Sequence, residues 1–210
     1  MTNKLLKAAV AVVILGAAAT LASAQVVGSA HDFTVLSGPT NYAFQTRSSN
    51  TCGTCHTIHN ALSQDAPLWI HTTTSATFTP YSSVTMNAVA GQPVSVSRAC
   101  LSCHDGTVAV NSVNGTIGTG GLVTGPVFIG GAAALGTDLS DDHPISIQYD
   151  ADPAMKPMAT VQGIFPLYGA SQNQVECGTC HDPHVPGTNG LFFRTYPTSY
   201  RSRCLVCHNK

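Results

Sequence analysis

The sequence is poor in charge: only 9% of its 210 residues are Asp, Glu, Lys or Arg, and the formal net charge is −1. A chain this close to neutral lacks the basic surface that binds nucleic acid, so we expect no nucleic-acid partner. Long apolar runs are absent after residue 24, and the mature chain is therefore expected to contain no membrane span. Unpaired cysteines are absent too, because all 8 cysteines occur as Cys-x-x-Cys pairs. The chemistry of this chain must be sought in those pairs.

The N-terminus has the features of a cleavable signal peptide. Lys4 and Lys7 precede an apolar stretch, and a small-x-small motif follows at 22–24. This pattern predicts that residues 1–24 are removed and that the mature protein begins at Gln25. A retained membrane anchor is the alternative, but the apolar run is short and the cleavage motif follows it at once. We therefore expect an exported protein, either periplasmic or extracellular and at the cell surface.

Each of the four Cys-x-x-Cys pairs is followed immediately by a histidine. This CxxCH pattern is the signature of c-type haem attachment. Two thiols at this spacing can form thioethers with the vinyl groups of one porphyrin, and the adjacent imidazole can bind the iron as its proximal ligand. The sequence thus predicts four haem c cofactors. The attachment residues are Cys52, Cys55, Cys100, Cys103, Cys177, Cys180, Cys204 and Cys207, and the proximal ligands are His56, His104, His181 and His208.

Two other uses of the cysteines are weighed against haem attachment. Disulfides are the ordinary expectation for an exported protein with many cysteines. Zinc is the better alternative, since the last two pairs have a spacing close to that of a Cys₄ zinc site. Neither alternative requires a histidine after every pair, whereas haem attachment does.

Five histidines lie outside the CxxCH motifs, and four haems with two axial ligands each need four of them. His59 and His184 each lie three residues after a proximal ligand, too close to reach the far side of the same haem. Each can instead reach the iron of a neighbouring haem, which would bring two haems into close contact. His143 precedes Pro144, and an adjacent carboxylate can orient its imidazole, although a polar turn is the plainer interpretation.

His31 and His71 compete for the remaining position. His31 lies near the mature N-terminus, where iron binding would tie down the terminal arm in its own subunit or in a neighbour. His71 follows Trp69 closely and can simply pack beside it.

The expected fold is mostly irregular, with a short helical turn at each CxxCH and few short strands, organised around a chain of stacked haems. The haem domain would span 25–210, as two weakly duplicated halves of about 25–114 and 137–210 joined by a glycine-rich segment. Alternation in Val94–Ser97 predicts a short strand. Apolar porphyrin faces would replace much of an ordinary core.

The order of motifs resembles that of multihaem cytochromes of the doubled-CxxCH group, and within it the OmcE-type extracellular cytochrome filaments. The segments that carry the resemblance are 30–33, 55–60, 66–69, 103–107, 142–145, 180–184 and 207–210. The resemblance implies haems with two histidine ligands and subunits that polymerise. It favours His31, His59, His143 and His184 as the distal ligands, with His71 as the spare.

These features predict electron transfer rather than catalysis, with other redox proteins or extracellular electron acceptors as partners and a homopolymer as the assembly. A multihaem reductase of the nitrite or hydroxylamine type is the alternative. Such an enzyme needs one haem with an open axial position, and the surplus of histidines disfavours it.

Overall fold

The computed structural model describes residues 26–33, 51–62, 65–117, 125–149, 152–185, 191–194 and 199–209. The predicted signal peptide, its cleavage site and residues 118–124 of the glycine-rich segment lie outside these ranges. The described chain is mostly irregular, with a few short helices and two-residue strands, as the sequence predicted. Within it, no helix combines the length and apolar character that crossing a membrane requires.

Four of the described helices coincide with the four CxxCH motifs, which confirms the predicted helical turn at each. The helices are η1 (Thr51–Thr54), α2 (Ser95–His104), η2 (Gly131–Ala133), α3 (Met158–Gln162), α4 (Cys177–Cys180) and α5 (Tyr200–Cys207).

The predicted strand at Val94–Ser97 is wrong, because α2 begins at Ser95. Ser97 and Leu101 are both fully buried, and residues four apart lie on one face of a helix. Four alternating residues are too few to separate a strand period from a helical one, and burial of this face decided the outcome.

The strands form two small antiparallel pairs. In the first, Asn114 and Gly115 both have positive φ, as the two central residues of a tight hairpin turn require. β1 (Ser112–Val113) pairs with β2 (Thr116–Ile117), and β3 (Ile147–Gln148) pairs with β4 (Gln174–Val175). The second pair joins the segment after His143 to the segment that leads into α4.

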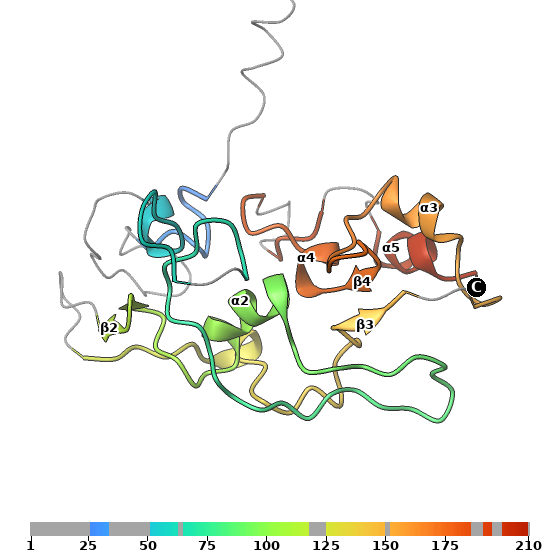
Figure 1. Ribbon diagram of the computed structural model, residues 1–210, viewed down its shortest axis with the longest axis horizontal. Helices are drawn as coiled ribbons and strands as arrows, with labels where there is room; N and C mark the ends of the chain where they lie inside the picture. Colours follow the sequence, from blue (N-terminus) through green and yellow to red (C-terminus); the bar gives the residue numbers. More distant parts are fainter. Residues whose placement is uncertain are drawn as a thin grey trace, which may run out of the picture.

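Helix α2 lies in the middle of the molecule, with η1 on one side and α3 and α5 on the other (Figure 1). It packs against α4, and the Ser97 hydroxyl accepts a hydrogen bond of 2.8 Å from the Cys177 backbone N–H. The first half of the chain therefore contacts the second through two of the CxxCH helices.

Within the described residues, buried apolar side chains form three separate clusters rather than one large cluster. A domain of ordinary composition usually has one contiguous core. The clusters are Tyr149, Val161, Phe165, Leu167 and Val206; Phe33 and Val110; and Phe78, Leu101 and Leu139.

Candidate functional site

In the CxxCH motifs, the histidine lies one helical turn beyond the first cysteine. In three of them the histidine N–H donates to the carbonyl of that cysteine, and in the fourth His104 is the last residue of α2. Both thiols and the imidazole therefore originate from a single turn of chain. The three bonds are His56 to Cys52 at 2.9 Å, His181 to Cys177 at 3.0 Å and His208 to Cys204 at 2.9 Å.

The same three histidines then join a second segment through a β-bridge. The backbone of each of these histidines is therefore held twice, by the hydrogen bond of the turn and by the bridge to the neighbouring segment. The bridges are His56 to Trp69, His181 to Phe193 and His208 to Met155.

Backbone carbonyls set the tautomer of three of the CxxCH imidazoles. A carbonyl can only accept, so Nδ1 carries the proton and Nε2 presents its lone pair, which is the form that binds a metal. The Nδ1 atoms lie 2.7 Å from the Pro67 oxygen in His56, 2.7 Å from the Ala133 oxygen in His104 and 2.9 Å from the Leu191 oxygen in His181.

Three of the CxxCH histidines each face one of the five histidines outside these motifs. The ring centres are 6.1 Å apart for His31 and His104, 6.0 Å for His56 and His184, and 6.5 Å for His143 and His208. The second of these pairs unites the two halves of the sequence.

Burial lowers the pKa of two histidine side chains of the site, His31 and His181, and so favours their neutral form. The pKa of His31 falls to about 4, chiefly because the ring is buried and secondarily because it lies near His104. Its ring also packs on Phe192, with centres 4.2 Å apart. Burial likewise lowers the pKa of His181. The neutral imidazole is the form that coordinates iron.

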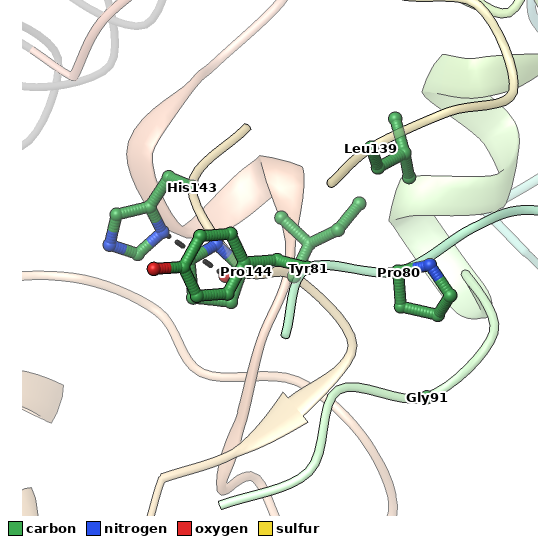
Figure 2. A pocket seen from close by; sticks show the side chains of 7 residues that line it. Pro80, Tyr81, Gly91, Leu139, His143 and Pro144 are labelled. Atoms are coloured by element: carbon green, nitrogen blue, oxygen red, sulfur yellow. Dashed lines mark hydrogen bonds between the residues drawn. The ribbon is translucent and has the colours of Figure 1, made fainter. Parts of the chain in front are cut away.

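The Nδ1 atom of His143 has a different hydrogen-bond partner from the one that the sequence suggested. Its Nδ1 donates to the Pro144 oxygen at 3.1 Å, so the prediction that an adjacent carboxylate orients this ring is wrong. The ring lies at one end of a small pocket, beside Tyr81 and across from Pro80 and Leu139 (Figure 2).

His71 is a buried core residue, only 1% exposed. Its Nδ1 lies 2.9 Å from the Thr72 oxygen, and its Nε2 lies 3.2 Å from the oxygens of both Ala109 and Val110. It also packs beside Trp69, with ring centres 6.0 Å apart. A neutral imidazole has one N–H, so only one of these nitrogens donates to a carbonyl. The Nε2 atom also lies 3.5 Å from the Sγ atom of Cys103.

His59 is exposed and, within the described part of the chain, belongs to none of the three pairs. Its backbone carbonyl accepts a hydrogen bond of 2.8 Å from the Thr57 hydroxyl, which tightens the chain just after His56.

Asp182 is a residue that sequence reasoning missed. Its carboxylate accepts from His184 Nδ1 at 3.2 Å and from Arg194 at 3.1 Å. Two other arginines have protein partners as well: Arg98 is paired with Asp65 at 2.9 Å, and Arg203 lies 4.4 Å from the ring centre of Phe193.

The eight cysteines are free thiols in this structure. Among the residues whose positions are described, no three His, Cys, Asp or Glu side chains gather as a metal-ion site. Comparison with protein-family models and with curated proteins found no match for this chain.

Proposed function

We propose that this protein is an electron carrier in which four haem c groups are each held by one CxxCH motif and by two imidazoles. The observation that carries the proposal is the set of three histidine pairs with ring centres 6.0–6.5 Å apart. When bound, each haem supplies a reversible one-electron change at its iron.

The separation within each pair fits one iron between two rings. A metal–imidazole bond is about 2 Å long and the ring centre lies roughly 1 Å beyond the nitrogen, so two imidazoles on opposite sides of one iron have centres roughly 6 Å apart. Rotation about the shared axis permits any angle between the ring planes, from the 20° of His56 and His184 to the 84° of His31 and His104. In each pair a CxxCH histidine supplies the proximal side.

The fourth pair follows by elimination. His181 is the proximal histidine left over, and its Nε2 lone pair is available because Nδ1 donates to Leu191. Of the two histidines without such a partner, His71 is 1% exposed and its Nε2 faces the oxygens of Ala109 and Val110 at 3.2 Å, whereas His59 is exposed, so we assign His59 to this position. This assignment also makes the two CxxCHxxH segments exchange ligands. His184 of the second segment faces His56 of the first, and His59 of the first segment would be the distal ligand opposite His181 of the second.

The divided core supports the same conclusion. In the part of the chain that the structure describes, the three clusters are separate, whereas a domain of this size normally has one contiguous core. Four porphyrins, attached to helices distributed along the molecule, would supply the missing apolar surface.

The direct test is to produce the full chain in a bacterium with its own haem c attachment machinery. We expect four covalent haems by intact mass, low-spin spectra and no carbon monoxide binding to the reduced protein. Full occupancy of one haem by carbon monoxide would instead support the reductase alternative. Absence of a haem absorption band would overturn the proposal altogether. The N-terminal sequence of the purified protein should begin at Gln25, which tests export.

We propose a filament as the assembled form, a step that rests on the resemblance alone. The pairing of His31 with His104 in one chain supports ligation within the subunit, so a neighbour is not needed to complete that centre. Electron microscopy of the red protein decides between the two assemblies. Long uniform filaments would support a molecular wire, and compact single particles would mean a soluble shuttle.

His71→Ala should leave the haem count and the low-spin spectrum of the protein unchanged. Because the buried ring loses its packing and its backbone carbonyls lose their partner, we expect unfolding to become easier by about 2–4 kcal/mol. Thermal denaturation followed beside the absorption spectrum measures both effects. A new carbon monoxide-binding haem in this variant would contradict the assignment of His71 as the spare histidine.

A further inference from the structure

Among the proposed haem ligands with an assigned Nδ1 partner, His184 is the one whose partner is charged. His56, His104, His181 and His143 all donate Nδ1–H to a backbone carbonyl, whereas His184 donates to the carboxylate of Asp182 at 3.2 Å. A neutral carbonyl oxygen orients the ring, but it is a weaker hydrogen-bond acceptor than a charged carboxylate. A carboxylate also shifts electron density into the imidazole and makes it a stronger ligand.

The position of Asp182 is fixed from several directions. Its backbone N–H donates to the Phe192 oxygen at 2.7 Å, and its second carboxylate oxygen accepts from Arg194 at 3.1 Å. Arg194 is held in turn, because its Nε donates to the Gly178 oxygen at 2.9 Å. The same carboxylate oxygen that faces the ring of His184 also accepts from its backbone N–H at 3.0 Å. The contact with His184 is therefore part of a connected network rather than an isolated encounter of two surface groups.

We propose that Asp182 is a positioning residue that aims His184 at the iron held by His56 and lowers the reduction potential of that haem. The inference rests on the proposed function and concerns one of its four centres. A more electron-rich imidazole stabilises the oxidised iron more than the reduced iron, which lowers the potential. Arg194 balances the charge of Asp182, so the effect acts mainly through the hydrogen bond to the ring.

The test compares two variants of the full holoprotein, Asp182→Asn and Asp141→Asn. Asp141 is a matched control, because it also lies two residues before a proposed distal ligand, yet His143 donates to Pro144 instead. In Asp182→Asn we expect one of four potentials to shift upward in a spectroelectrochemical titration. The same variant should show a changed low-spin electron paramagnetic resonance signal for one haem. Asp141→Asn should change neither the signal nor the potentials to a comparable extent.

Two results would overturn the inference. Unshifted potentials in Asp182→Asn with four low-spin haems would mean that the carboxylate neither positions nor tunes the ligand. Equal shifts of the reduction potential in both variants, without a change in the resonance signal, would mean that the potentials respond only to the loss of a negative charge. Intact mass and the wild-type spectrum report separately on the proposed function, since a protein without haem would show no low-spin signal in any variant.

Discussion

A His31→Ala variant is expected to keep four covalent haems and to lose low-spin ligation at one of them. The thioethers depend on the cysteines and are unaffected, but the ring that lies 6.1 Å from His104 is removed. His71 is not expected to replace this ring, because it is buried and its Nε2 faces the backbone oxygens of Ala109 and Val110 at 3.2 Å. Carbon monoxide should therefore bind to roughly a quarter of the reduced haem, as absorption difference spectra would measure.

His71→Ala is the matched control for this variant, because it also removes a buried imidazole but not a proposed ligand. Four fully low-spin haems in His31→Ala would contradict the pairing of His31 with His104. Dilution of the wild-type protein gives an independent check on which subunit supplies the ring. A ligand from the same chain leaves the spectrum independent of protein concentration, whereas a ligand from a neighbour is lost as subunits separate.

The helical turn at each CxxCH motif could be predicted because it depends on local sequence. The structure confirms a turn at each motif, whereas haem attachment there remains a prediction from the pattern of two thiols and an imidazole within five residues. The general fold followed from the same reasoning, since the sequence shows short turns, many glycines and no long amphipathic helix. The strand predicted at Val94–Ser97 was wrong because its four residues carry too little periodic information to oppose the burial of a helical face.

The pairing of histidines could not be predicted because it depends on contacts distant in sequence. His56 and His184 belong to opposite halves, and nothing in either CxxCHxxH segment states that they face each other. That His71 packs beside Trp69 was foreseen from their proximity in the chain, and the structure confirms it. The contacts of its Nε2 depend on the carbonyls of Ala109 and Val110 in the segment after α2, which no local pattern indicates.

The two Asp-x-His segments show this limit most clearly. Asp141 and Asp182 lie at the same spacing before His143 and His184, and the sequence analysis suggested orientation by a nearby carboxylate only for His143. The structure has the opposite arrangement, because the backbone of Asp182 is fixed by Phe192 and its side chain by Arg194. A carboxylate can orient a ring only where other contacts hold the carboxylate itself.

Replacing Cys100 and Cys103 together by serine is expected to remove one of the four haems and to slow electron exchange among the other three. Helix α2, which carries both cysteines, lies in the middle of the molecule between η1 and the C-terminal helices (Figure 1). Electron transfer weakens steeply as the gap between donor and acceptor widens, so a missing central haem should separate the haems on either side. Intact mass under denaturing conditions measures the loss, and rapid-mixing reduction with a limiting electron donor measures the exchange.

The matched control replaces Cys204 and Cys207, which lie on α5 near the C-terminus. This variant should also lose one haem, but the three that remain would still be neighbours, so the remaining absorption should redistribute as quickly as in the wild type. If both variants exchanged electrons equally fast, the haem on α2 would lie off the transfer path. If either variant kept four covalent haems, the CxxCH motifs would not be the attachment sites. Each variant loses one haem, and the two differ only in where that haem lies, so a difference in their rates of electron exchange would be an effect of haem position.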